Sequence, residues 1–239
     1  MNSSHPLSAS PRSEFLSGCR GIFPLVVGAI PFGIIYGTLA AASGLSFVGT
    51  LAMSAAVFAG SSQFIAIGLL ASGTAVPLII LTTFFVNLRH LLYSVSIVPH
   101  VHHLSQFWKL LLGFWLTDEA FVVAIDRYNQ TDSSPDKHWY QMGASILMYL
   151  NWLLCTFIGL TIGHRMTNAA EWGLDFAMAA TFIGMIIPYL KNQPMILSVL
   201  AAGIMALLTH HFPHQLGLIL STLTGILVGT LSERFITRT

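Results

Sequence analysis

The most constraining feature of this sequence is a long run without charge. From Gly21 to Leu88, 68 consecutive residues include no Asp, Glu, Lys, Arg or His. A helix needs about 20 apolar residues to cross the core of a bilayer, so the run is long enough for about three crossings. Over all 239 residues only 8% are charged and 54% are apolar, whereas a soluble domain carries about 25% charged residues. The sequence therefore predicts an all-α, polytopic membrane protein.

Turn-forming clusters divide the chain into about eight candidate spans. Small polar residues with Gly or Pro at 43–46 and 71–77 are typical of turns. The predicted spans, some of them broken by Gly, Pro or Ser, cover 21–42, 47–70, 77–97, 109–126, 139–163, 173–190, 195–210 and 214–232. The count becomes seven or six if a short span leaves the membrane on the side from which it entered.

The domain organisation that follows is simple. A polar N-terminal segment, 1–20, with two prolines reads as a mobile tail. A single transmembrane transport domain is expected over 21–233, and a short tail over 234–239.

The distribution of Lys and Arg predicts the orientation, because cytoplasmic loops carry an excess of both. With eight spans and the N-terminus inside, the outer segments hold only Lys109 and Arg165. The inner segments hold Arg12, Arg20, Arg127, Lys137, Lys191, Arg234 and Arg238. We therefore expect both termini in the cytoplasm and the segment around Ser105 outside.

Composition argues against several other classes of protein. A net charge of +1 and a pI near 7.9 give no clustered basic face for nucleic acid. Two cysteines, Cys19 and Cys155, are too few for a disulfide framework or a multi-cysteine metal site. The phosphate-binding pattern GxxxxGK[ST] does not occur in the sequence. We therefore expect a protein that is not an enzyme, with no catalytic site, cofactor or resident metal.

Three GxxxG steps suggest close helix packing, because glycine lets two backbones approach each other in lipid. They are Gly33–Gly37, Gly159–Gly163 and Gly225–Gly229. Packing within the bundle is the simpler interpretation, and docking of a separate subunit is the alternative.

The first cluster of polar residues lies midway along the predicted span 47–70, where Ser61, Ser62 and Gln63 follow Gly60. Such residues suit a helix that opens and offers amide N–H groups and hydroxyls to an anion. Alternatively, the hydroxyls bond back to the preceding turn and Gln63 bridges to a neighbouring helix.

The second cluster lies in the predicted span 77–97. Asn87 and His90 are three residues apart on one helix face, and Arg89 and Tyr93 are four apart on the adjoining face. An arginine at this depth costs about 2.5–3.5 kcal/mol on insertion scales unless it is paired or hydrated. Its planar guanidinium suits a carboxylate, either from the protein or from a substrate.

The third cluster, Asp118 and Glu119, lies near the middle of the predicted span 109–126. Adjacent acids are about 100° apart on a helix, so they do not easily share one partner. We expect one acid to pair with Arg89 and the other to face a cavity or take up a proton. A purely structural Arg89–Asp118 pair is the alternative.

Together these groups suit a path for a small polar or zwitterionic solute. A competing interpretation is a metal or other small-solute transporter, because histidines cluster at His100–His103 and His210–His214. A channel or scaffold without coupled transport is a third possibility, but it would need neither acid at 118–119.

The segments AGSSQF (59–64), NLRHLLYS (87–94) and LTDEAF (116–121), in this order and spacing, resemble the AzlC-type branched-chain amino acid permeases. The resemblance covers the chain from about Cys19 onward and rests on hydropathy more than on particular residues after 139. It implies the large subunit of a two-component exporter of leucine, isoleucine, valine and methionine in a bacterial inner membrane. It also implies a small AzlD-type membrane subunit as partner.

Combining the resemblance with the residues, we expect a proton-coupled secondary transporter of small apolar amino acids. The substrate carboxylate would bind near Ser61–Gln63 and Arg89, and its ammonium near Asp118 or Glu119. Proton coupling would run through Glu119, Asp118 or His90.

Overall fold

The computed structural model describes residues 10–132, 134–163, 183, 187, 190–212 and 216–236. In these residues the chain is helical, as the sequence predicts. It forms two compact units, unit 1 up to Asp175 and unit 2 from Phe176, where the sequence suggested one transport domain. The predicted span 173–190 lies almost wholly outside the described residues.

Three helices of unit 1 are long and apolar enough to cross a membrane: α1 (Pro11–Ala42), α4 (Val76–Val101) and α7 (Lys137–Gly163). They contain the predicted spans 21–42, 77–97 and 139–163. The Ser10 side chain caps α1 by accepting a hydrogen bond from the Ser13 amide. The helix therefore extends through the second half of the predicted N-terminal tail.

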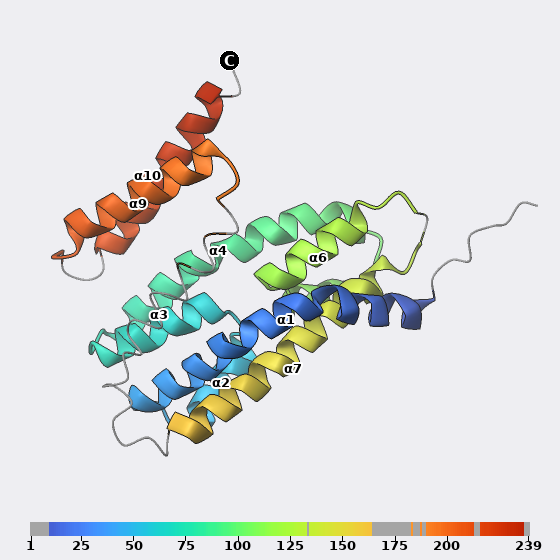
Figure 1. Ribbon diagram of the computed structural model, residues 1–239, viewed down its shortest axis with the longest axis horizontal. Helices are drawn as coiled ribbons and strands as arrows, with labels where there is room; N and C mark the ends of the chain where they lie inside the picture. The colour runs from blue at the N-terminus through green and yellow to red at the C-terminus, as the bar shows by residue number, and fades with distance from the viewer. Residues whose placement is uncertain are drawn as a thin grey trace, which may run out of the picture. The chain divides into compact units, whose positions relative to one another are not determined.

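α1 and α7 lie side by side and run parallel (Figure 1). A Cβ atom built on Gly37 would come within 2.3 Å of the Thr156 carbonyl oxygen, and one on Gly159 within 2.0 Å of the Ile34 carbonyl oxygen. The two backbones are therefore in direct contact where the glycines lie. The GxxxG steps of both helices pack within the chain, so these faces do not dock a separate subunit.

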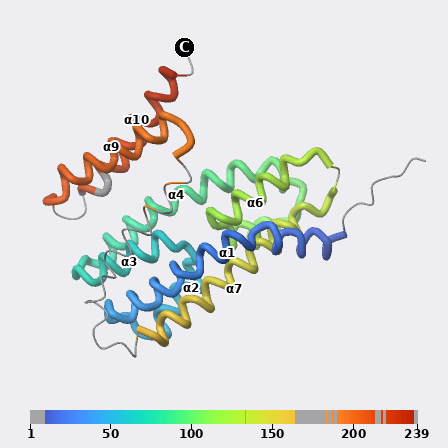
Figure 2. Tube along the Cα trace, in the orientation of Figure 1, coloured from blue at the N-terminus to red at the C-terminus, as the bar shows by residue number. Residues whose placement is uncertain are grey.

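α4 runs in the opposite direction to α7. Near the end of α4, Ile97 and Val101 share a buried cluster with Met142, which lies near the start of α7. The end of α4 therefore lies beside the beginnings of α7 and α1, as the Cα trace shows (Figure 2).

Two short helices form hairpin 1, α2 (Phe47–Ala56) and α3 (Gly60–Ala71). α2 ends halfway along unit 1. Its position is shown by the carbonyl of Ala55, which accepts a 3.1 Å hydrogen bond from the hydroxyl of Tyr149 in the middle of α7. α3 then returns, and Leu69 near its end packs on Ile79 near the start of α4. Hairpin 1 thus starts and ends at the same end of unit 1.

Two further short helices form hairpin 2, α5 (Gln106–Phe114) and α6 (Asp118–Tyr128). α5 also ends at the middle of α7, where the ring of Trp115 lies 5.9 Å from that of Tyr149. α6 returns to the start of α7, where the Tyr128 hydroxyl donates a 2.9 Å hydrogen bond to Gln141. Hairpin 2 starts and ends at the end of unit 1 opposite to hairpin 1.

Unit 1 thus consists of three long helices with a half-length hairpin after each of the first two. The pattern of α1 followed by hairpin 1 recurs, upside down, as α4 followed by hairpin 2. The segments 47–70 and 109–126, counted as two crossings, each turn back instead, which is the alternative in which a short span leaves on the side from which it entered. Each segment breaks in the middle, and its second half forms a separate helix that runs back toward the end of unit 1 from which the first half came. The count of eight spans is not confirmed.

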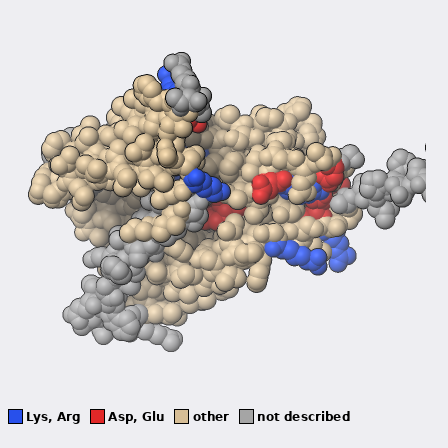
Figure 3. All heavy atoms as spheres, turned by 45° about the horizontal axis from the view of Figure 1, so that its top comes forward, with Lys and Arg blue, Asp and Glu red and all other residues tan. Residues whose placement is uncertain are grey.

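Charge marks one end of unit 1, where α1, α5 and α7 begin, and we call it the basic end. The ring of Trp108 lies 4.8 Å from that of Trp139, so the neighbouring Lys109 lies at this end too. The basic side chains there are Arg12, Arg20, Lys109, Arg127 and Lys137. The described loops at the other end, 43–46 and 72–75, contain no charged residue, and we call it the uncharged end. Figure 3 shows how little charge the rest of the visible face carries.

This arrangement changes the predicted sidedness. With 109–126 as a full crossing, the sequence predicts Lys109 and Ser105 on the side opposite to Arg127. The structure places all three at the basic end, so that prediction is wrong. The Lys and Arg bias within unit 1 becomes stronger as a result, and a cytoplasmic N-terminus stays a prediction.

Unit 2 contains an antiparallel pair of helices, α9 (Gln193–Thr209) and α10 (Leu216–Ile236). The Ser198 hydroxyl donates a 2.7 Å hydrogen bond to the carbonyl of Gly225. A Cβ atom on Gly229 would lie 3.2 Å from Ser198. The third GxxxG step is thus also used in packing within the chain.

The glycine contacts predict a difference between two substitutions on α1. Gly37→Ala should lower the melting temperature and the yield of folded protein, because its methyl group would overlap the backbone of α7. Overpacking of this kind costs about 1–3 kcal/mol. Gly28→Ala is the matched control, because nothing lies within 4 Å of a Cβ atom at Gly28. Equal melting temperatures for the two variants in detergent would contradict the packing.

The two-hairpin arrangement predicts which loops share a membrane face. Single cysteines at Ser105 and Thr131 should react with an impermeant thiol reagent from the same face, and a cysteine at Ser72 from the other. The measurement is labelling of right-side-out and inverted vesicles that carry Cys19→Ala and Cys155→Ala. Labelling of Ser105→Cys and Thr131→Cys from opposite faces would instead support a continuous span between them.

Candidate functional site

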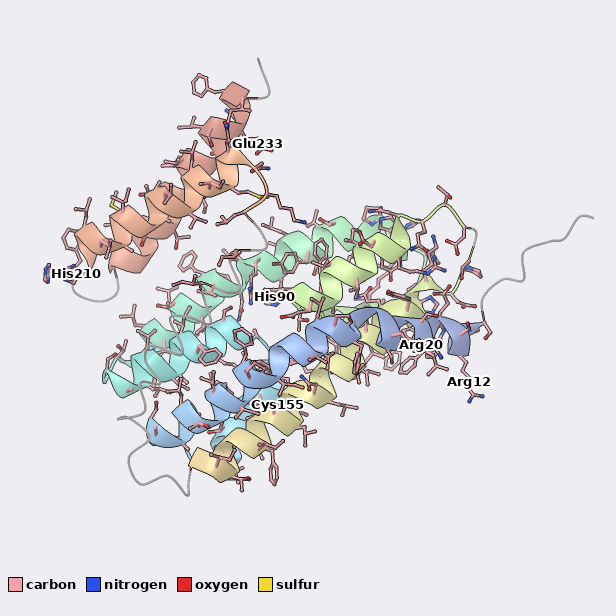
Figure 4. The ribbon with its side chains drawn as sticks, viewed as in Figure 1. Arg12, Arg20, His90, Cys155, His210 and Glu233 are labelled. Carbon is pink, nitrogen blue, oxygen red and sulfur yellow. The ribbon has the colours of Figure 1, made fainter. Side chains whose placement is uncertain are left out.

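The tips of both hairpins meet at the middle of α4. Arg89 is the fourteenth of the 26 residues of α4, and its neighbour His90 lies midway along this helix in Figure 4. One terminal nitrogen of the guanidinium donates to Asp118, the first residue of α6. The other donates a 2.7 Å hydrogen bond to the hydroxyl of Ser61, the second residue of α3. The predicted pairing of Arg89 with an acid of 118–119 is confirmed, and Ser61 joins it.

The chain breaks at the two tips in different ways. Hairpin 1 turns through Val57, Phe58 and Ala59, and Phe58 adopts a positive φ of 43°, which a bulky side chain rarely adopts. Hairpin 2 turns through Trp115, Leu116 and Thr117. The predicted opening of the helix near Ser61 is confirmed, and the second break is an addition to the prediction.

The helix starts at the tips also differ in chemistry. Thr117 caps α6 by accepting a hydrogen bond from the Ala120 amide, and two acids occupy the first turn of this helix. Ala59 precedes α3 and makes no side-chain cap. The first amides of a helix have no partner within the helix, and the positive end of its dipole favours an anion. The start of α3 therefore attracts a negative group that hairpin 1 does not itself supply.

Four buried polar atoms on these elements have no hydrogen-bond partner among the described residues. They are Nε of Arg89, Nε1 of Trp115, Oδ1 of Asp118 and Oδ1 of Asn87. Buried polar atoms are normally paired, because an unpaired one costs about 1–3 kcal/mol. The open donor of Arg89 and the open acceptor of Asp118 belong to one ion pair, and they are suited to a ligand that carries both charges.

Glu119 and His90 flank this group. Glu119 follows Asp118 in the first turn of α6 and forms no ion pair with any described residue. His90 is next to Arg89, and its Nδ1 lies 3.2 Å from the Asn87 carbonyl oxygen. Both are placed near the charged pair without being part of it.

Ser62 and Gln63 lie at the same tip but make hydrogen bonds within the bundle. The Ser62 hydroxyl donates to the Ala59 carbonyl at 2.9 Å. The Gln63 amide donates to Ser54 at 3.0 Å and accepts from the Trp152 indole at 3.1 Å. Both side chains are fully buried. Their geometry matches the alternative interpretation, in which these groups hold helices together.

Tyr93 lies one turn beyond Arg89 on α4 and stacks on Phe121 of α6, with ring centroids 4.6 Å apart. It thereby joins α4 to hairpin 2 at the side of the charged pair that faces the basic end.

Sequence reasoning missed Tyr149, which contacts both tips from α7. Its ring lies 4.9 Å from that of Phe58 at tip 1 and 5.9 Å from that of Trp115 at tip 2. The tips are thus enclosed between Arg89 on one side and Tyr149 on the other. The spacing of aromatic residues along the chain gives no signal for this meeting, because the three residues come from separate elements.

A second charged cluster lies at the basic end. Glu14 of α1, only 2% exposed, pairs with Arg127 of α6, which also binds Asp132 at 2.8 Å. Hydrogen bonds from Arg127, and then from Lys137, hold the pKa of the Asp132 carboxyl well below its ordinary value. Asp132 therefore stays charged at neutral pH, and the ion pair of Arg127 with Glu14 ties hairpin 2 to α1.

The histidine clusters do not form a metal site in the part of the chain that the structure describes, where no three His, Cys, Asp or Glu side chains are placed to hold an ion. His100 and His103 line a cavity of about 260 Å³ at the basic end, together with His138 and Lys137. His214 of the second cluster lies outside the described residues.

A family model described as AzlC protein matches residues 24–166 of the chain. This range includes both hairpins, Arg89 and the two acids of α6. No solved structure matches the chain.

Several curated proteins are similar along most of their length. The branched-chain amino acid transport protein AzlC of Bacillus subtilis is 32% identical over 179 residues, which are 72% of this chain and 68% of that protein. The inner membrane protein YgaZ of Escherichia coli is 26% identical over 97% of this chain and 94% of its own length. An uncharacterized membrane protein of Archaeoglobus fulgidus is 29% identical over 94% of this chain and 97% of its own length.

Proposed function

The chain belongs to the AzlC family, and on that premise we propose that it is a secondary transporter that exports branched-chain or other small apolar amino acids. The name of the Bacillus subtilis relative, a branched-chain amino acid transport protein, supports this substrate class. The name of the Escherichia coli relative supports a bacterial inner membrane as the location. The observation that carries the proposal is the set of unpaired atoms around Arg89 and Asp118.

The substrate carboxylate binds between Arg89 and the start of α3. The guanidinium still has an N–H at Nε that no described residue accepts, and a planar guanidinium binds carboxylates through two parallel hydrogen bonds. The uncapped amides of Gly60 and Ser61 add donors and the positive end of a helix dipole. In this structure the Ser61 hydroxyl accepts a hydrogen bond from Arg89. The substrate carboxylate is a stronger acceptor and can replace it.

The substrate ammonium binds at the start of α6. Asp118 uses one carboxylate oxygen for Arg89, and the other is buried without a partner among the described residues. A zwitterion therefore satisfies the donor and the acceptor that the resting site leaves open, whereas a simple acid or amine satisfies only one of them.

Proton coupling runs through Glu119. Binding of a substrate carboxylate by Arg89 offsets the positive charge that lies near both acids, so the neighbouring Glu119 takes up a proton more readily. Asp118 is fixed by its ion pair, whereas Glu119 forms none with the described residues, which makes Glu119 the better carrier. His90 is the second candidate for the proton carrier.

A small AzlD-type membrane subunit remains the proposed partner, by analogy with the family. The glycine steps do not support it, because they are used inside the chain. The long apolar face of α4 is a better candidate, since large side chains on it such as Phe84, Leu91 and Val95 are exposed in this chain alone.

The zwitterion site predicts which solutes exchange. In proteoliposomes with and without the AzlD-type subunit, leucine should drive counterflow of labelled leucine. Its deaminated analogue 4-methylpentanoate and its decarboxylated analogue 3-methylbutylamine should not, because each leaves a buried charge unpaired. Counterflow by either analogue at the rate of leucine would remove the zwitterion proposal.

Arg89→Lys serves as the variant in the same assay. It keeps a positive charge for Asp118 but loses the Nε donor and the paired geometry, so the half-saturating leucine concentration should rise by about tenfold or more, the equivalent of about 1.4 kcal/mol. Arg20→Lys is the control, because Arg20 lies near the basic end, away from the hairpin tips. Equal half-saturation for both variants would exclude Arg89 from the substrate site.

The coupling proposal predicts a split phenotype for Glu119→Gln, which keeps the shape and removes the titration. Counterflow of leucine should persist, and acceleration by a pH gradient should be lost. Asp126→Asn, two turns further along α6, is the matched control and should respond to the gradient like the original protein. If Glu119→Gln retains gradient-driven transport, the proton carrier lies elsewhere.

A further inference from the structure

The two hairpins reach the same residue from opposite ends of unit 1. Hairpin 1 starts and ends at the uncharged end and places Ser61 on Arg89, and hairpin 2 starts and ends at the basic end and places Asp118 on it. No other element of the described chain contacts the guanidinium through a hydrogen bond. Hairpin 1 thus covers Arg89 from one end and hairpin 2 from the other, while 26% of the Arg89 side chain stays exposed.

Each tip is held by a similar pair of contacts. Tip 1 is held to α4 through Ser61 and to α7 through the ring of Phe58 on Tyr149. Tip 2 is held to α4 through Asp118 and to α7 through the ring of Trp115 on Tyr149. Arg89 and Tyr149 are therefore shared contact points for two elements that are otherwise separate.

The pair of long helices α1 and α7 is poorly suited to move apart, whereas the hairpins are short. α1 and α7 are in backbone contact along their length, where Gly18, Gly37 and Gly159 leave no room for a Cβ atom. Interfaces packed this closely shift as a whole or not at all. α2 has 10 residues, α3 12, α5 nine and α6 11, and each pair ends at a tip of three residues. Movement that exposes Arg89 is therefore easiest at the hairpins.

We propose that the two hairpins are the two gates of the transport path: hairpin 2 opens the Arg89–Asp118 site toward the basic end, and hairpin 1 opens it toward the uncharged end. This inference rests on the proposed transport function for its purpose, but its geometry concerns access alone. Transporters built from inverted repeats commonly alternate access by moving one repeat against the other around a fixed site. Here the fixed part is the closely packed pair of α1 and α7, which carries Tyr149, and Arg89 lies on α4, which packs mainly on the second helix of each hairpin, α3 and α6.

The shared arginine gives the gates a reason to alternate. When hairpin 2 opens, Asp118 leaves Arg89, and the guanidinium then depends on Ser61 and the start of α3 for its remaining partners. Opening of hairpin 1 at the same time would leave the guanidinium without either partner in an apolar surrounding, which is costly. A substrate carboxylate at Arg89 replaces the missing partner and lets the other gate open next.

Tyr149 acts in this scheme as a positioning residue. Its hydroxyl holds the end of α2 through the Ala55 carbonyl at 3.1 Å, while its ring supports both tips. Tyr149→Phe removes the hydroxyl contact with hairpin 1 and leaves the ring contacts. This substitution should therefore loosen hairpin 1 and not hairpin 2.

The test is side-specific labelling of buried tip residues. Ala59 at tip 1 and Leu116 at tip 2 are each 4% exposed. Single cysteines are placed at each in the full chain with Cys19→Ala and Cys155→Ala, and vesicles of both orientations are treated with an impermeant thiol reagent. Leu116→Cys should react from the face of the basic end, and Ala59→Cys from the face of the uncharged end. A gate that is open for about 10% of the time should let its tip cysteine react about tenfold more slowly than an exposed loop cysteine on the same face.

Cysteines at Ser105 and Ser72 identify the two faces in the same vesicles, so the test does not depend on the absolute orientation of the chain. Adding Tyr149→Phe should raise the labelling rate of Ala59→Cys and leave that of Leu116→Cys unchanged. If either tip variant fails to fold, Ser62→Cys and Ala120→Cys replace them, since both side chains are fully buried in the first turn of their helices.

Reaction of both tip cysteines from the same face, or of neither while Ser105→Cys and Ser72→Cys react, would overturn the gate proposal. Labelling needs no knowledge of the solute, so its result is independent of the leucine assay. Opposite-face labelling without leucine counterflow would refute the substrate and keep the gates. Leucine counterflow with same-face labelling would refute the gates and keep the substrate.

Discussion

Everything in unit 1 is arranged around the cost of placing a guanidinium halfway along an apolar helix. Arg89 requires an acid and further polar partners at a depth where water is scarce, and the only sources are other segments of the chain. Two segments provide them by breaking in the middle, so that their polar first turns, and not their apolar flanks, face the arginine. A broken helix in turn is tolerated in lipid only where protein covers its open backbone groups. The pair of hairpins, the two long helices beside them and the ion pair are thus mutually dependent.

The sequence predicted the parts of this arrangement that depend on composition. The charge-free run from Gly21 to Leu88 predicted a helical membrane protein, and the turn clusters located three long helices and the two of unit 2 to within a few residues, apart from the N-terminal extension of α1. The ion pair of Arg89 and Asp118 followed from the energy of unpaired charge alone. The opening before Ser61 followed from four small residues and a Gln in an apolar context.

The connectivity was harder to predict, because a hairpin of 25 apolar residues and a continuous span of the same length have the same hydropathy. A signal for the second break was present: Thr117 followed by two acids is typical of a helix start, and α6 does start at Asp118. The roles of Gln63 and Tyr149 could not be derived, since they depend on partners such as Trp152 and Phe58 that only the fold brings near. The two hairpins also change the side of the membrane predicted for Lys109. A hairpin in place of a predicted crossing inverts the predicted side of every residue that follows it, and a second hairpin inverts it back.

In unit 1 the pattern of a long helix followed by a hairpin recurs upside down, and this has a consequence for the direction of transport. Two halves in which a long helix and a hairpin recur upside down do not by their backbone arrangement favour flow one way or the other. Any preference must come from what differs between the halves. Hairpin 2 carries two carboxylates at its tip, and hairpin 1 carries only hydroxyls and bare amides. Direction in such a molecule is a property of a few side chains on a symmetrical frame, so exporters and importers of this architecture can differ by little more than the acids at one helix start.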